Sequence, residues 1–194
     1  MPINVTLLFS REQYLAAAEA YLRGIERRIA EGKDPKVSSV ASVFVSRWDV
    51  AVNDTVPAPL RNRLGIAMSG RIHKAYRDLL SSARWRKLAD AGALPQRLLW
   101  GSTGTKDKSA PDTMYVDALA APDTVNTMPE ATLRAFADHG NVTRPLPADG
   151  GDAEKVLGEF AAAGVDIDAL ATKLQRDGAD AFVKSWHSLL ECLE

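Results

Sequence analysis

The sequence predicts an α/β fold in which parallel strands alternate with helices. Short apolar runs rich in Val, Ile and Leu are separated by longer segments whose apolar residues recur with the helical period. Such alternation favours a parallel sheet with right-handed crossovers. The four strands of this pattern are too few to close an eight-stranded barrel, so we expect half of one, followed by a C-terminal helical tail that contains no strand.

Residues 3–47 are predicted to form the first β-α-β unit. Its first strand, residues 3–9, interleaves Asn4 and Thr6 with apolar side chains. Ser10 is the predicted N-cap of a helix over residues 11–31, which ends at Gly32. The second strand, residues 37–47, is apolar and β-branched enough for burial on both faces, and it runs directly into an arginine.

The later elements are predicted in the same way, from short apolar runs for strands and the helical period for helices. Thr127, with Pro129 and Glu130 behind it, has the pattern of an N-cap for a helix that ends near residue 138. The other expected elements are helical stretches at about 60–80 and 83–89, a strand at 94–100, a short helix or loop at 114–120 and a brief strand at 124–126.

Three regions follow from these elements. Residues 1–140 are the expected half-barrel, and residues 141–151, rich in Gly, Pro and Asp, are a connector. Residues 152–194 are an expected helical extension packed on the barrel, with helices at 152–163, 167–178 and 179–193. Because the first strand starts almost at Met1, we expect further sequence upstream of it.

The composition excludes several classes of function. The 24 basic and 25 acidic residues are mixed along the chain, so no surface of one charge is expected to bind nucleic acid or an anionic membrane. No apolar run approaches the roughly 18 residues of a membrane helix. The single Cys192 excludes an intrachain disulfide framework and fits a reducing compartment, and residues 1–10 lack the basic start of a signal peptide. A cytoplasmic location is expected.

Polar side chains gather where the predicted strands end. Arg47 places a guanidinium at the carboxyl end of the second strand, where parallel α/β folds bind ligands and where a planar donor fork suits a phosphate or carboxylate. An ion pair with Asp49 is the alternative. Asn4, Thr6 and Ser42 need hydrogen-bonding partners if they face the inside of a barrel, whether water, substrate or one another.

The loop G-S-T-G-T-K, residues 101–106, offers a second anion contact. Its glycines, hydroxyls and Lys106 could surround a phosphate with backbone N–H groups, although the spacing is not that of a P-loop. An ordinary surface turn is the alternative reading. Together with Arg47 on a neighbouring strand, the phosphate interpretation is favoured.

Common catalytic patterns are missing from the sequence. His73, His139 and His187 show no metal-ligand spacing, so neither a metal nor a cofactor is predicted. No G-x-S-x-G motif is present, and no Cys lies near a His. The lysines occupy polar faces or loops, where nothing lowers the pKa of the amine for imine formation, and Lys106 and Lys108 alone lie near the proposed site.

Several stretches of the sequence closely resemble transaldolases, in particular the longer bacterial type. They are N-V-T-L-L-F-S (4–10), S-V-A-S-V-F-V-S-R-W-D (39–49), P-Q-R-L-L-W-G-S-T-G-T-K (95–106), A-P-D-T-V-N-T-M-P-E (121–130) and A-F-A-D-H-G (135–140). The resemblance spans nearly the whole chain but only the carboxyl-terminal half of such an enzyme. It implies that the strands are the fifth to eighth of a (β/α)8 TIM barrel.

The resemblance also implies a reaction. Transaldolases transfer a dihydroxyacetone unit from sedoheptulose 7-phosphate to glyceraldehyde 3-phosphate, giving erythrose 4-phosphate and fructose 6-phosphate, through a lysine Schiff base in the pentose phosphate pathway. The imine-forming lysine lies on the fourth strand in a motif similar to I-K-x-x-x-T, and the catalytic Asp and Glu lie on the first and third strands. No such lysine motif occurs in this chain, which is therefore expected to be inactive alone.

What the resemblance assigns to this chain is the other wall of the site. Asn4 resembles the contact to a substrate hydroxyl, and Thr6 the residue that positions the proton-transfer water. Arg47 resembles the phosphate-binding arginine and Ser102 a second phosphate contact, while Ser42 and Phe44 would line the pocket near the imine carbon. Some family members have an arginine where this chain has Gly104, so Lys106 is expected to supply the second positive charge.

Three functional hypotheses follow. The first is a transaldolase segment that binds a sugar phosphate and requires the missing amino-terminal half. The second is a non-catalytic half-barrel module that pairs with a second copy of itself, because open parallel strands leave edges and an apolar face. The third is a sugar-phosphate-binding protein without turnover.

Overall fold

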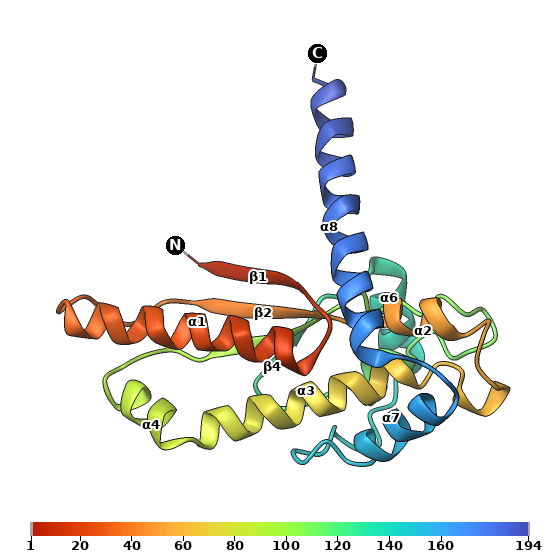
Figure 1. The fold of residues 1–194 in the computed structure, drawn as a ribbon, viewed down its shortest axis with the longest axis horizontal. Coiled ribbons are helices and arrows are strands. Elements are labelled where there is room, and N and C mark those ends of the chain that lie inside the picture. Colours follow the sequence, from red (N-terminus) through yellow and green to blue (C-terminus); the bar gives the residue numbers. More distant parts are fainter. Residues whose placement is uncertain (1, 194) are drawn as a thin grey trace.

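A computed structural model describes residues 2–193 and shows a four-stranded parallel sheet with helices along one side (Figure 1). The α/β fold predicted from the sequence is confirmed, and it corresponds to half of a TIM barrel with a C-terminal helix. In chain order the elements are β1 (Ile3–Leu8), α1 (Arg11–Ala30), β2 (Ser39–Phe44), α2 (Ser46–Val52), the 3-10 turn η1 (Ala58–Leu60), α3 (Leu64–Ser81), α4 (Ala83–Asp90), β3 (Gln96–Gly101), α5 (Met114–Ala118), β4 (Thr124–Asn126), α6 (Glu130–His139), α7 (Ala153–Ala162) and α8 (Ile167–Glu191).

The strands lie in the order β1-β2-β3-β4, so β1 and β4 are the two edges of the sheet. Asn4 pairs with Val40, and Ser42 pairs with Leu99. The register of β1 against β2 shifts between Val5 and Leu8, where Leu7 has a positive φ of 60°. This irregularity lies next to the end of the strand that the C-terminal helix contacts.

One face of the sheet is buried under helices and the other is open. The buried face carries Ala41, Val43 and Leu98, and each of these side chains is fully inaccessible. Burial of one such aliphatic or aromatic side chain contributes roughly 1.5–3 kcal/mol, so this face supplies much of the folding free energy. The opposite face, which we call the open face, carries the exposed or half-buried side chains of Asn4, Thr6, Val40, Phe44, Arg97 and Leu99.

A capping box starts α1 as predicted. The Ser10 hydroxyl accepts a hydrogen bond from the Gln13 N–H at 3.2 Å, and the Gln13 side chain accepts from the Ser10 N–H at 3.2 Å. Two backbone N–H groups at the start of the helix, which have no acceptor within the helix, are thereby hydrogen-bonded. The chain leaves the helix at Gly32, whose φ of 65° favours glycine.

Strand β2 ends earlier than the sequence predicted. The expected strand ran to Arg47, but Ser46 and Arg47 form the first turn of α2. The N–H groups of Val45 and Ser46 still bond to the carbonyls of Gly101 and Ser102, and the Trp48 N–H then turns back to the Val45 carbonyl. Because Val45 and Trp48 are buried in either conformation, the apolar pattern did not reveal the change from strand to helix.

The predicted N-cap at Thr127 was wrong. Helix α6 begins at Glu130, after Pro129 in the cap position. The hydroxyl and N–H of Thr127 both donate to the Trp100 carbonyl, each at 3.1 Å. Thr127 therefore ties the end of β4 to β3 and does not cap the helix.

The tail expected as two helices, 167–178 and 179–193, is one continuous helix, α8. Gly178 lies inside this helix and does not end it. The glycine is needed for close packing, since a side chain there would meet Leu7 and Arg47. Ala171, Leu174 and Gly178 are buried on the body of the protein. From Ala179 onward the helix is exposed, and it extends away from the body past β1 (Figure 1).

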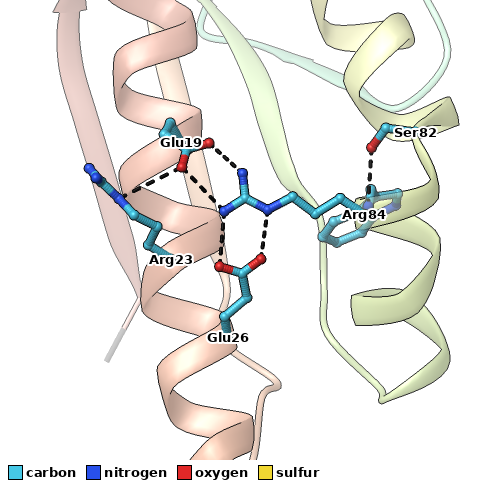
Figure 2. A network of polar contacts seen from close by, with 6 residues as sticks. Glu19, Arg23, Glu26, Ser82 and Arg84 are labelled. Carbon is cyan, nitrogen blue, oxygen red and sulfur yellow. Dashed lines mark hydrogen bonds and ion pairs between the residues drawn. The ribbon is translucent and has the colours of Figure 1, made fainter.

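A polar network joins α4 to α1 on the surface. Arg84 donates to both carboxylate oxygens of Glu26, at 2.6 and 2.9 Å, and to both of Glu19, at 2.5 and 3.2 Å (Figure 2). Hydrogen bonds from this guanidinium lower the pKa of both carboxyls. Ser82 caps α4 by accepting from the Trp85 N–H at 3.1 Å. Since the network is exposed, it orients α4 more than it stabilises the fold.

Among the described residues, no helix has the length and apolar character that a membrane crossing requires.

Candidate functional site

Arg47 lies at the carboxyl end of β2, in the first turn of α2. Its guanidinium carbon is 4.9 Å from the centroid of the Phe44 ring, so the cation is held over an aromatic face. Within residues 2–193 no carboxylate lies within ion-pairing distance of Arg47, and the alternative pairing with Asp49 does not occur. Among the described residues, this guanidinium therefore has an aromatic contact and no ion pair.

The proximal part of α8 crosses directly over this region. A Cβ built on Gly178 would lie 2.8 Å from Cδ2 of Leu7 and 3.2 Å from Nη1 of Arg47. Gln175 donates a hydrogen bond to the Leu7 carbonyl at 3.0 Å, which anchors the helix at the irregular end of β1. Helix α8 thus forms one side of the surface around Arg47.

Two of the predicted polar residues are each other's partners. The Ser42 hydroxyl donates to Oδ1 of Asn4 at 2.6 Å, between β2 and β1. Asn4 is exposed on the open face, where its amide N–H groups can donate to a ligand, whereas Ser42 is buried behind it. Thr6 is exposed two residues further along β1, so the strand alternation places it on the same face.

Ser102 follows the end of β3 and contacts Ser46, the residue before Arg47. Its hydroxyl is 2.8 Å from the Ser46 hydroxyl, and its carbonyl accepts from the Ser46 N–H at 3.0 Å. Ser102 has a positive φ of 56°, a conformation that costs free energy for a residue with a side chain. The structure therefore places Ser102 against Ser46 at the ends of β2 and β3, while Arg47, the next residue, packs on Phe44.

Lys106 is placed elsewhere. It is exposed and lines a hollow of about 520 Å³ together with Asp107, Lys108 and residues of α2, and Arg47 is not part of that lining. The loop before it is held by its own hydroxyls, since Thr103 donates to Oδ1 of Asn126 at 2.8 Å and Thr105 to the Pro111 carbonyl at 2.9 Å. The structure does not bring Lys106 to the Arg47 surface.

Asp49, considered from the sequence only as an ion-pair partner of Arg47, is a buried carboxylate behind the site. Asp49 is 1% exposed and accepts hydrogen bonds from the Tyr115 hydroxyl at 2.7 Å, the Leu64 N–H at 2.8 Å and the Gly65 N–H at 3.2 Å. Burial raises the pKa of this carboxyl above its ordinary value, against the opposing effect of the three donors. Asp49 joins α2 to the start of α3 and so fixes the turn that carries Arg47. Gly65 leaves room for this carboxylate, since a Cβ there would lie 2.7 Å from Oδ2 of Asp49.

In the part of the chain that the structure describes, no group of three His, Cys, Asp or Glu side chains is arranged to hold a metal ion. His73 is buried beneath the connector, where its Nδ1 is 3.2 Å from the Pro147 carbonyl and its Nε2 has no partner among the described residues. It is a packing residue, remote in sequence from the strand ends.

Fold and site together define a class: a parallel β/α half-barrel with polar residues at the carboxyl ends of its strands and an arginine there that has no ion pair within residues 2–193. Comparison with known proteins gives the family. The family profile described as Transaldolase/Fructose-6-phosphate aldolase matches residues 1–193, and this chain belongs to that family.

The curated relatives are named transaldolases. Those of Saccharopolyspora erythraea and Thermobifida fusca are each 44% identical, over 196 and 198 residues, and each match covers 97% of this chain and 54% of the relative. The transaldolase of Neisseria meningitidis serogroup A is 41% identical over 189 residues, with the same coverage. The chain thus spans about half the length of the curated relatives it matches, as expected for the carboxyl-terminal half of a transaldolase.

Proposed function

We propose that this chain is one half of a transaldolase barrel and forms the wall that binds the substrate's phosphate and hydroxyl groups. The observation that carries the proposal is Arg47, a half-buried arginine without an acidic partner among residues 2–193, held over Phe44 at the strand ends. An arginine fork binds a phosphate through two parallel hydrogen bonds. Ser102, which contacts the neighbouring Ser46, is the proposed second phosphate contact.

The open face of the sheet would hold the rest of the substrate. Asn4 and Ser42, already bonded to each other, would contact substrate hydroxyls, and Thr6 would position the water that transfers a proton. Phe44, the last residue of β2, whose ring lies under Arg47, would line the pocket near the imine carbon. The role of Lys106 as the second positive charge for the phosphate stays a prediction. Its side chain lines a neighbouring hollow that does not include Arg47.

The nucleophile would come from the other half. Imine formation needs a lysine whose pKa is lowered by an apolar surrounding, as on an inward face of a barrel strand. None of the four strands carries a lysine. We therefore propose that the chain has no transaldolase activity alone and that the amino-terminal half, joined or supplied separately, completes the site. A cytoplasmic location belongs to the same proposal.

A coupled assay with fructose 6-phosphate and erythrose 4-phosphate tests this function. The isolated chain is expected to show no turnover. Addition of the amino-terminal half of the Thermobifida fusca transaldolase, a relative of which this chain matches 54%, is expected to restore turnover. Turnover by the isolated chain, or no turnover after the halves have assembled, would contradict the proposal.

A rival arrangement is a pair of copies that close a barrel through their open faces. The exposed face and the free edges of β1 and β4 are the observations that favour it. Size-exclusion chromatography with light scattering separates the two cases. A monomer that binds the amino-terminal half supports the transaldolase arrangement, whereas a stable dimer that excludes this half supports the rival.

A further inference from the structure

The distal half of α8 carries an apolar surface that nothing covers within the described chain. Phe182, Val183, Trp186, Leu189 and Leu190, which we call the α8 stripe, are each at least 40% exposed. Their spacings of three and four residues place them on one side of the helix. Side chains of this size, gathered on one helix face, mark an interaction surface more often than a solvated one.

The α8 stripe continues a face that is already buried. Ala171, Leu174 and Gly178 pack on the body of the protein. Residues about eleven apart lie on the same side of an α-helix, and Phe182 and Leu189 stand at this distance from the buried Ala171 and Gly178. The same side of one continuous helix is therefore covered up to Gly178 and bare beyond it. Because a helical segment of this length is marginal without tertiary packing, the bare part requires a surface to lie on.

The position of α8 indicates where that surface is. The helix is anchored to the end of β1, through Gln175 on the Leu7 carbonyl and Gly178 on the Leu7 side chain. Strand β1 is an edge of the sheet, and α8 extends past it (Figure 1). In a closed barrel the free edge of β1 pairs with the last strand of the amino-terminal half. That half would lie next to the distal part of α8.

We propose that the α8 stripe docks on the amino-terminal half of the barrel, so that α8 crosses the junction between the halves beside the Arg47 surface. This inference rests on the proposed function, because it assumes that a second half closes the sheet. It commits to that half, and not to a second copy, because the relatives that this chain matches contain a further portion of about its own length. The curated relatives are about twice as long as this chain, and the additional length is sufficient for such a half.

The test measures how tightly the full chain binds the amino-terminal half of the Thermobifida fusca transaldolase, by titration with analytical ultracentrifugation. The stripe variant is Trp186→Ser with Leu189→Ser. The matched control is Leu133→Ser, an equally exposed leucine on α6. The stripe variant is expected to weaken binding at least about tenfold, because two large apolar side chains lose their burial. The control is expected to change it less than about twofold.

Hydrogen exchange gives a second measurement that does not depend on affinity. Amides of residues 182–190 are expected to exchange rapidly in the isolated chain and to become protected when the amino-terminal half is bound or is fused before Met1. Exchange of the β3 amides reports that each sample is folded.

Each outcome has a distinct meaning. Equal binding by the wild type and the stripe variant, with no protection of α8, would overturn the docking inference and leave the proposed function standing. If the Thermobifida fusca half binds its own carboxyl-terminal half but not this chain, both proposals are overturned. Self-association that the stripe variant abolishes, with binding of the amino-terminal half unchanged, would assign the stripe to a second copy and also overturn the inference.

Discussion

Gly178 of α8 approaches Arg47 of α2 so closely that a Cβ on the glycine would lie 3.2 Å from the guanidinium nitrogen Nη1. The same Cβ would lie 2.8 Å from Cδ2 of Leu7 at the end of β1. Absence of a side chain at residue 178 is therefore what lets one helix pass over the proposed phosphate site. This close packing also explains why a glycine is present inside the continuous helix α8.

Substitution Gly178→Ala is expected to displace the ends of the Leu7 and Arg47 side chains. The helical preference for alanine and the cost of this displacement should offset each other, so stability should stay close to that of the wild type. Gly158→Ala in α7, where no atom lies within 4 Å of the added Cβ, should instead stabilise by roughly 0.5–1 kcal/mol. Guanidinium chloride unfolding measures both, and an equal gain would show that residue 178 is not crowded.

Arg47→Ala is expected to remove most of the affinity for fructose 6-phosphate. A hydrogen bond to a charged group contributes about 1.5–3 kcal/mol, which corresponds to roughly a tenfold to hundredfold loss. Arg47→Lys should recover part of the affinity, because a lysine keeps the charge but not the fork. Isothermal titration measures the three proteins. Arg134→Ala, which removes an exposed arginine of α6 paired with Glu130, is the control, and an equal loss in that variant would argue against a specific site at Arg47.

Tyr115→Phe is expected to destabilise the fold by about 1–3 kcal/mol, because the buried Asp49 carboxylate loses a donor without gaining water. Since this donor stabilises the charged carboxylate, the deficit should be full near pH 7. It should diminish as the pH falls through the raised pKa of Asp49, where the carboxyl is protonated. Urea unfolding at several pH values measures it. Tyr14→Phe is a matched control, since the buried Tyr14 hydroxyl makes no hydrogen bond among the described residues. Equal losses of unfolding free energy in the two variants would contradict the proposed contribution of the Tyr115–Asp49 hydrogen bond.

His73 is expected to make stability fall in mild acid. Burial lowers the pKa of its imidazole below the ordinary 6.5, so the unfolded chain binds a proton at a higher pH than the folded one. The cost is absent above pH 6.5 and grows as the pH falls from 6.5 to the lowered pKa of the folded state. His73→Asn keeps a donor for the Pro147 carbonyl. This variant should flatten the curve of unfolding free energy against pH below pH 6.5.

The difference between the two unfolding curves isolates His73. Hydrogen bonds to Asp112 and Asp138 raise the pKa of His139, and this residue contributes the opposite slope in both proteins. A curve of the variant that parallels the wild type below pH 6.5 would contradict the assignment.

The repeating elements of the fold were predictable because their periods are set by local chemistry. The four strands, the Ser10 cap and the helix over residues 11–30 follow from alternation, apolar runs and side-chain caps. The end of β2 was not predictable, because Val45 and Trp48 are buried in either a strand or a helix. Thr127 was misassigned because its hydroxyl serves a neighbouring strand, a contact that local spacing does not encode.

The candidate site was predictable where it depends on residue type and not where it depends on tertiary contacts. Arg47 and Ser102 are at the strand ends as expected, and Asn4 bonds to Ser42, one of the partners considered for it. The crossing of Arg47 by Gly178, more than a hundred residues away in sequence, could not be inferred from spacing. The contacts of Asp49 were equally hidden, because its three donors come from two segments distant in sequence, the start of α3 and Tyr115 of α5.

Borohydride trapping with fructose 6-phosphate tests the central claim most directly. The amino-terminal half of the Thermobifida fusca transaldolase and this chain are assembled, reduced in the presence of the substrate, and digested for mass spectrometry. We predict that the modified lysine lies in the amino-terminal half, that no lysine of residues 1–194 is modified, and that this chain alone is not labelled. A substrate-derived adduct on a lysine of this chain would contradict the claim that it binds the phosphate and leaves imine formation to its partner.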